Sequence, residues 1–167
     1  MNYNFIDKYF FFFFSILPIS IVVGPTVSLI NVLIIVFSFL FYILKNNEWD
    51  WLKNTSIKLL LILYVYLIFN SIIALEPSLT LVRNLGFIRF IIFFFAFNYF
   101  FHKNEHFNKV FIIWLIVLTV IIFDVFLESF TGTNLLGYGT GDRIVSFFKD
   151  EQVVGTFVAS FFLLIIG

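Results

Sequence analysis

Long hydrophobic runs separated by short polar segments make up most of this chain. A helix that crosses a bilayer needs about 20 mostly apolar residues, with roughly 17–25 tolerated. The runs predict five membrane-spanning helices and the start of a sixth, at residues 9–23, 27–44, 57–75, 85–101, 110–127 and from 153 onward. The predicted fold class is all-α, a polytopic transmembrane helical bundle of about six spans.

These spans divide the chain into three parts. Residues 1–128 form a five-span helical region, residues 129–152 a glycine-rich loop, and residues 153–167 the start of the sixth helix. The last run would make about 22 Å of helix, against a hydrocarbon core of about 30 Å. No polar flank follows it. The pattern therefore predicts a truncated sixth helix and a chain that is a fragment of a longer protein.

The composition of the chain excludes several classes of protein. The chain is 62% hydrophobic and only 12% charged, whereas a soluble domain carries about 25% charged residues. Ten basic residues balance ten acidic ones, so overall charge suggests no nucleic-acid partner. Because there are no cysteines, disulfides and thiolate metal sites are excluded.

The distribution of lysine predicts the orientation of the spans. Positive residues in short loops mark the cytoplasmic side. If the spans alternate, six lysines share the side of the N-terminus: Lys8, Lys45, Lys53, Lys58, Lys103 and Lys109. The N-terminus is therefore expected in the cytoplasm, in a multi-pass membrane protein. The glycine-rich loop is then on the outer side of the membrane.

Within that loop, Arg143 is the first candidate for binding. Glycines at positions 137, 139 and 141 permit a backbone that turns its amides toward an anion. A guanidinium group beside them can hold two phosphate oxygens through parallel hydrogen bonds. The alternative is an arginine that is simply solvated in a surface loop.

Other charged residues are predicted at the same side of the membrane. Arg83 lies in the outer loop before the fourth span, Arg89 one turn into that span, and Asp124 one turn before the fifth span ends. Glu151 lies in the glycine-rich loop. Charged groups at depth are expected to face the bundle or a wet cavity. Alternatively, Arg89 reaches the outer headgroups and Asp124 pairs with it structurally.

Two short motifs are discounted. His102 to His106 fits H-x-x-E-H, but it lies in a short connector with no evident third ligand, so no metal site is predicted. Gly137-Tyr138-Gly139 is similar to part of a potassium selectivity filter. Leu135 stands where that filter has its threonine, so a channel is not predicted.

Three segments resemble the bacterial O-antigen ligase/polymerase family: Ser71 to Arg89 (SIIALEPSLTLVRNLGFIR), Asp124 to Tyr138 (DVFLESFTGTNLLGY) and Arg143 to Phe162 (RIVSFFKDEQVVGTFVASFF). The third is the most telling, with an arginine, a short aromatic turn, an acidic pair, a glycine and a new span. The chain would correspond to the N-terminal part of such a protein, a multi-pass protein of the bacterial inner membrane with its glycine-rich loop in the periplasm.

The resemblance implies transfer of a glycan from undecaprenyl pyrophosphate to an acceptor, in lipopolysaccharide or related polysaccharide assembly. The acceptor is the lipid A core in ligases and a growing chain in polymerases; membrane lipids surround the protein, and no metal or other cofactor is implied. Arg143 would be the main pyrophosphate contact, with Arg89 and Arg83 as helpers and Asp124 and Glu151 as supporting polar groups.

The resemblance leaves the catalytic residue unassigned. The family places its catalytic histidine in a C-terminal half that this sequence lacks, so the chain alone is not expected to be active. Two alternatives stay open: a small membrane transporter or flippase, and an inactive truncated remnant.

Overall fold

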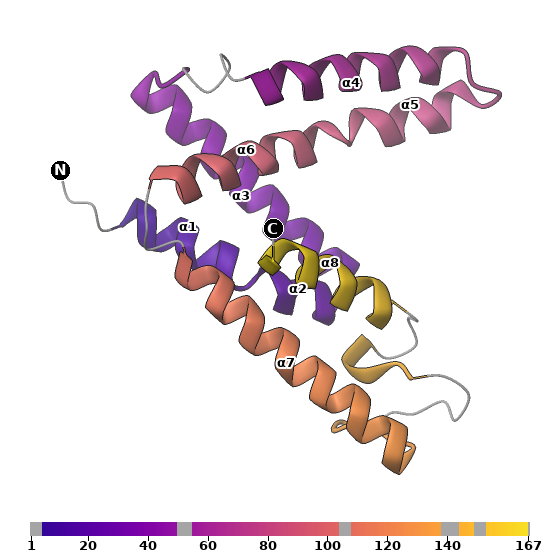
Figure 1. Ribbon diagram of the computed structural model, residues 1–167. Coiled ribbons are helices and arrows are strands. Elements are labelled where there is room, and N and C mark those ends of the chain that lie inside the picture. The colour runs from indigo at the N-terminus through magenta and orange to yellow at the C-terminus, as the bar shows by residue number, and fades with distance from the viewer. Residues whose placement is uncertain (1–4, 50–54, 104–107, 138–143, 149–152, 167) are drawn as a thin grey trace. The chain divides into compact units, whose positions relative to one another are not determined.

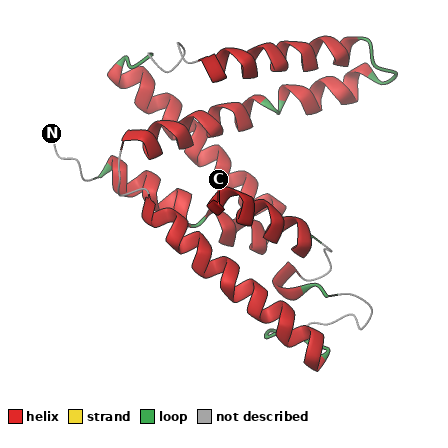
Figure 2. Ribbon diagram, viewed as in Figure 1, coloured by secondary structure: helices red, strands yellow, loops and turns green. Residues whose placement is uncertain are grey.

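The computed structural model describes residues 5–49, 55–103, 108–137, 144–148 and 153–166 of the chain. These residues form helices and short connections, and none of them is in a strand (Figure 2). The chain divides into two compact units. Unit 1 comprises residues 1–31 and 105–167, and unit 2 comprises residues 32–104.

Unit 1 is organised around one long helix. Its elements are α1 (Ile6–Ser15), α2 (Leu17–Val23), the first turns of α3 (Pro25–Asn46), α7 (Asn108–Thr131), the short 3₁₀ helix η3 (Ser146–Phe148) and α8 (Val154–Ile166). Helices α1, α2 and α8 and the η3 turn all pack against α7 (Figure 1). Helix α7 ends at Thr131, one turn beyond the predicted end of the fifth span, so the loop begins later than expected.

The expected first span is broken. Helices α1 and α2 meet at an angle of 42°, because Pro18 has no N–H to donate to the carbonyl oxygen of Phe14 four residues earlier. The indole of Trp114 donates to that oxygen instead, at 2.8 Å. The side-chain amide of Asn31 donates to the neighbouring carbonyl of Phe13 at 3.3 Å. Donors from other helices thus replace part of the bonding that the break removes.

Apolar side chains from helices α1, α2, α7 and α8 bury one another in unit 1. The ring of Trp114 meets that of Phe161 edge-on, with centroids 5.3 Å apart. The buried apolar side chains of these helices include Phe10, Phe14, Leu17, Val110, Trp114, Leu118, Ile121, Phe157 and Phe161. This core fixes the face of α7 on which the candidate site lies.

Unit 2 contains the remainder of α3, then α4 (Thr55–Ile72), α5 (Pro77–Leu85) and α6 (Ile88–Lys103). Helix α4 runs beside α5 (Figure 1). The amide of Asn84 joins them by donating to the carbonyl of Leu67 at 3.1 Å and to the hydroxyl of Ser71 at 2.7 Å. The segment expected to be an outer loop before the fourth span is therefore largely helical, because Pro77 begins a helix and Asn84 anchors it.

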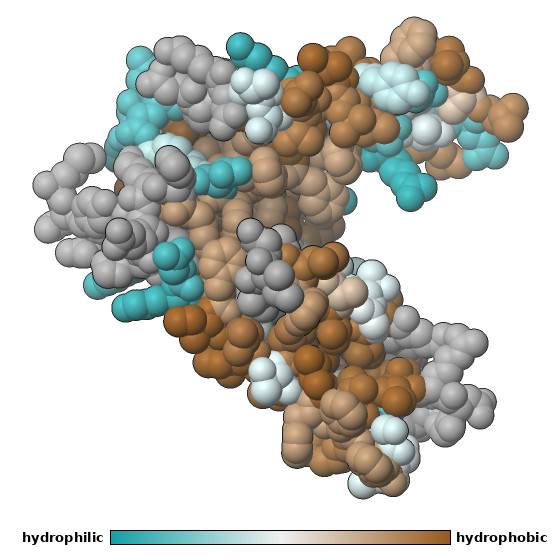
Figure 3. Space-filling model, viewed as in Figure 1, coloured by the Kyte–Doolittle hydropathy of each residue, from teal (hydrophilic) through white to brown (hydrophobic). Residues whose placement is uncertain are grey.

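Four helical stretches are long and apolar enough to cross a membrane: Pro25–Asn46, Thr55–Ile72, Pro77–Phe101 and Asn108–Thr131. The bent pair α1–α2 makes a fifth if it is one span, and α8 is a shorter apolar helix. Many large apolar side chains are exposed, such as Phe37 at 66% and Val65 at 67%, and brown predominates over the described surface in view in Figure 3. The described chain is thus all-helical and compatible with a membrane protein.

Candidate functional site

Two acidic residues are buried on the last turns of α7. Asp124 is fully buried and Glu128 is 4% exposed. They are four residues apart and therefore share one face of the helix. Apart from Lys109, they are the only charged residues of α7. We call Asp124 and Glu128 the carboxylate pair.

Asp124 holds both sides of the loop that follows α7. One carboxylate oxygen accepts the backbone N–H of Leu135 at 2.8 Å. The other accepts the hydroxyl of Ser146 at 2.5 Å. We call residues 132–137 the first arm of the loop and residues 144–148 the second arm. A single side chain therefore links the two arms.

Among the described residues, the carboxylate of Glu128 binds only the second arm. Its carboxylate oxygens lie 3.1 and 3.2 Å from the backbone nitrogen of Val145, and one of them accepts the N–H of Ser146 at 2.6 Å. Asn134 adds a direct link between the arms, because its side-chain amide donates to the carbonyl of Ser146. The same side chain accepts the N–H of Leu136 at 3.0 Å.

The backbone of the arms depends on positive φ angles. Gly132 and Gly137 have φ of 77° and 80°, where glycine is favoured because it has no Cβ. Ser146 also has a positive φ, of 50°, which costs an L-residue about 1–2 kcal/mol. Its N–H, hydroxyl and carbonyl all make hydrogen bonds with the carboxylate pair or Asn134. These bonds offset the strain.

The carboxylate pair is satisfied by hydrogen-bond donors. Burying a charge is costly unless it is paired and hydrogen-bonded, and N–H groups bound to carboxylates make short, strong bonds. All four carboxylate oxygens accept at least one donor from the arms. No group of three or more His, Cys, Asp or Glu side chains able to hold a metal occurs among the described residues. The pair therefore anchors the loop.

No family model, curated protein or solved structure matches this chain. Function is therefore inferred from the site itself and from the resemblance of three segments to the O-antigen ligase/polymerase family.

Of the candidate residues in unit 1, Asp124 is at the centre of the site. Arg143 and Glu151 lie outside the described residues. Sequence reasoning overlooked Glu128, Ser146 and Asn134. The spacing of Asp124 and Glu128 in an otherwise apolar helix was the available signal, because buried charges require partners. No sequence feature of this kind identifies Ser146 or Asn134 as site residues.

The other two candidate arginines belong to unit 2. Arg83 is exposed in the last turn of α5, where a cation is favoured by the helix dipole. Arg89 is partly buried, and its guanidinium carbon lies 4.9 Å from the ring centroid of Phe90. Its Nε atom is buried without a hydrogen-bond partner among the described residues. Pairing of Arg89 with Asp124 stays a prediction, since the two residues belong to different units.

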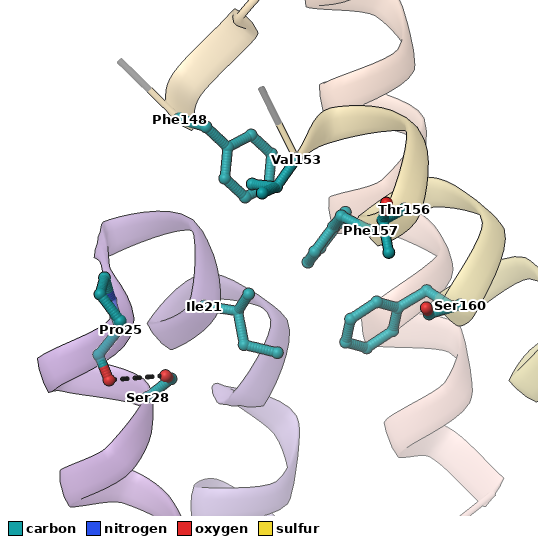
Figure 4. Close-up of a pocket in the computed structure, with 9 residues that line it drawn as sticks. Ile21, Pro25, Ser28, Phe148, Val153, Thr156, Phe157 and Ser160 are labelled. Atoms are coloured by element: carbon teal, nitrogen blue, oxygen red, sulfur yellow. Dashed lines mark hydrogen bonds between the residues drawn. The ribbon is translucent and has the colours of Figure 1, made fainter. Parts of the chain in front are cut away.

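A cavity of about 330 Å³ lies beside η3 in unit 1. Figure 4 shows Phe148 of the second arm on one side of it, with Ile21 and Pro25 opposite and Phe157 of α8 completing the apolar wall. The hydroxyl of Ser28 at its edge donates to the carbonyl of Pro25 at 2.9 Å. The cavity thus borders the same segment that Glu128 anchors.

Proposed function

We propose that this chain is a multi-pass protein of the bacterial inner membrane, similar to the N-terminal part of O-antigen ligases and polymerases. In this proposal it binds undecaprenyl pyrophosphate that carries a glycan, for transfer to the lipid A core or another glycan acceptor. The role that we assign to the chain is binding and positioning of the diphosphate. We assign no catalytic residue.

The observation that carries the proposal is the anchoring of the loop by the carboxylate pair. Arg143 is two residues before Val145 in the sequence, and the N–H of Val145 is bound by Glu128. A contact residue next to a fixed backbone loses less entropy on binding than one in a free chain. The anchor therefore supports a role for Arg143 in recognition.

The chemistry of the ligand fits an arginine beside a membrane. The isoprenoid tail of the carrier lies in the bilayer, and its diphosphate lies at the surface. Guanidinium binds phosphate oxygens in pairs. Negative charge grows on the diphosphate as the glycan leaves, so a cation held there stabilises the transition state more than the ground state.

The first experiment compares lipids on the intact chain in nanodiscs. We expect undecaprenyl diphosphate to bind at least about tenfold more tightly than undecaprenyl monophosphate, because only the diphosphate offers the second group of charge-assisted contacts. Equal affinity for the two lipids would contradict recognition of the carrier through its diphosphate. Competition by the free glycan at the same site would contradict recognition through the carrier.

A second experiment tests the proposed orientation. Because the chain has no cysteine, single cysteines can be introduced at Thr140 in the loop and at Asn47 after α3. An impermeant thiol reagent added to spheroplasts should label the Thr140→Cys variant and spare the Asn47→Cys variant. The opposite result would place the loop in the cytoplasm and contradict a periplasmic site.

A small transporter is the second candidate, and the break between α1 and α2 favours it. Broken spans line the substrate sites of many transporters, and this one is bent by 42°. Accumulation of a substrate in vesicles containing the chain would support transport. Binding of the diphosphate lipid without movement across the bilayer would favour the first proposal.

A further inference from the structure

The break between α1 and α2 holds a buried cluster of polar side chains. Ser15 ends α1, Ser20 lies in α2, and Asn31 lies in the unit 1 part of α3. Their exposed fractions are 9%, 4% and 5%. We call these three residues the break cluster. Burial of polar groups is costly unless they find partners, so the hydrogen bonds of the cluster decide what it can bind.

Asn31 bridges the two halves of the broken span. Its Nδ2 atom donates to the carbonyl oxygen of Phe13 in α1 and to the hydroxyl of Ser20 in α2, both at 3.3 Å. These acceptors fix the orientation of the amide, because a flipped amide would set its oxygen against the carbonyl oxygen of Phe13. The Oδ1 atom of Asn31 is buried, and no described residue donates a hydrogen bond to it.

Ser15 has an unpartnered hydroxyl at the same break. A hydroxyl in a helix can donate to a carbonyl of the preceding turn, as the hydroxyl of Ser20 does to the carbonyl of Leu17 at 2.7 Å. The Oγ atom of Ser15 is buried and makes no hydrogen bond with any described residue. The break therefore presents two buried oxygen atoms, from Ser15 and Asn31, that can each accept an electropositive partner.

We propose that the break cluster is a binding site for a sodium ion. The Oδ1 atom of Asn31 and the Oγ atom of Ser15 are its ligands, and the oxygen atoms of Phe13 and Ser20 lie beside the same amide. Transporters coordinate Na⁺ through oxygen atoms at the broken part of a span, and this span is bent by 42°. The inference does not depend on the proposed lipid carrier, and it concerns other residues of unit 1.

The charges around the cluster favour a monovalent ion. Sites for divalent cations rely on carboxylate ligands. Among the described residues, α2 and α3 contain no acidic residue, and α1 contains only Asp7, in its first turn. In α7, the carboxylate oxygens of Asp124 and Glu128 already accept hydrogen bonds from the loop. Neutral oxygen ligands suit a single positive charge, and Na⁺ approaches them more closely than the larger K⁺, which strengthens the attraction.

Binding of the ion should stabilise the broken span. Occupation gives both oxygen atoms a partner and links α1 to α3 across the break. A ligand that binds only the folded state raises its stability as the ligand concentration increases. Sodium chloride should therefore raise the unfolding temperature of the chain above its value in choline chloride of equal ionic strength, because choline is too large for a buried site. A cluster that holds only water predicts equal unfolding temperatures in the two salts.

Equilibrium dialysis of the intact chain in detergent against radioactive Na⁺ measures the site directly. We expect saturable binding of a single ion. Ser15→Ala removes an unpartnered hydroxyl and no described hydrogen bond, so this variant should fold while its affinity for Na⁺ falls at least about tenfold. Asn31→Leu should weaken binding as well, and its helix content by circular dichroism shows whether it folds.

Ser28→Ala is the matched control for the loss of a hydroxyl. The hydroxyl of Ser28 donates to the carbonyl of Pro25 and lies outside the break cluster, so this variant should bind Na⁺ as the unaltered chain does.

Two results would overturn the site: absence of saturable Na⁺ binding, or unchanged affinity in the Ser15→Ala variant. Equal displacement of labelled Na⁺ by K⁺ and by unlabelled Na⁺ would overturn the choice of sodium. Because no lipid takes part in these measurements, a chain that binds Na⁺ but not undecaprenyl diphosphate would keep this site and lose the proposed function.

Discussion

Trp114 donates its indole N–H to the carbonyl oxygen of Phe14 at 2.8 Å, although the two residues are 100 positions apart in the sequence. Pro18 is the reason that this oxygen needs a donor from another helix. The bond ties α7 to the break between α1 and α2, and it lies in the core on which the carboxylate pair depends for its position.

Replacing Trp114 with Phe should destabilise the protein. An aromatic ring remains, but the buried carbonyl of Phe14 loses its side-chain donor, which costs about 1–3 kcal/mol. Pro18→Ala in the same chain supplies the missing backbone N–H, so the double variant should recover part of the loss. Chemical denaturation in detergent measures both changes.

Trp49→Phe is the matched control for that experiment. Trp49 is 41% exposed and donates its indole N–H to the side chain of Asn47, so its loss should change stability by no more than about 0.5 kcal/mol. Equal effects of the two Trp→Phe changes, or no recovery in the double variant, would show that the bond to Phe14 does not support the break.

The helices were largely predictable from sequence, but their ends and breaks were less so. Hydropathy located α3, α4, α6 and α7 because lipid and a protein interior favour the same apolar runs. Hydropathy could not show that residues 77–85 form a helix, because that segment contains polar residues. One of them, Asn84, hydrogen-bonds to α4, a contact that hydropathy does not detect. The 42° bend between α1 and α2 occurs within the first predicted span, where Pro18 interrupts the helical hydrogen bonding.

The site was only partly predictable. Asp124 stood out as a charge in an apolar span, but its partners come from Leu135 and Ser146, 11 and 22 residues away. No local rule connects a carboxylate to backbone N–H groups at such separations. The positive φ of Ser146 could not be predicted either, because a serine in a polar loop gives no sequence signal for that backbone conformation.

Two substitutions of Ser146 separate its strain from its hydrogen bond. Ser146→Ala keeps the cost of the positive φ and loses the bond to Asp124, so it should be strongly destabilising. Ser146→Gly loses the same bond but relieves the backbone, and it should be less destabilising than the alanine variant by about 1 kcal/mol. Thermal unfolding of the two variants side by side gives the difference. An alanine variant as stable as the glycine variant would contradict the strained conformation.

Gly137 and Gly155 form a second matched pair. A Cβ at either position would meet no atom within 4 Å, so space does not distinguish them. Gly137 has a φ of 80°, and Gly137→Ala should cost about 1 kcal/mol or more. Gly155 is in α8, where Gly155→Ala should be neutral or stabilising by up to about 1 kcal/mol. If Gly137→Ala and Gly155→Ala changed the measured stability in the same direction, the result would argue against the turn assigned to the first arm.

The most direct test of the account is the affinity of the chain in nanodiscs for undecaprenyl diphosphate, with and without Arg143. Arg143→Ala should weaken binding at least about tenfold while leaving membrane insertion and helix content unchanged, because a bidentate charged contact is lost. Lys58→Ala, which removes a positive charge from the predicted cytoplasmic side, should have no effect. Unchanged affinity in the Arg143→Ala variant would contradict the proposal that the anchored loop presents this residue to a lipid-linked diphosphate.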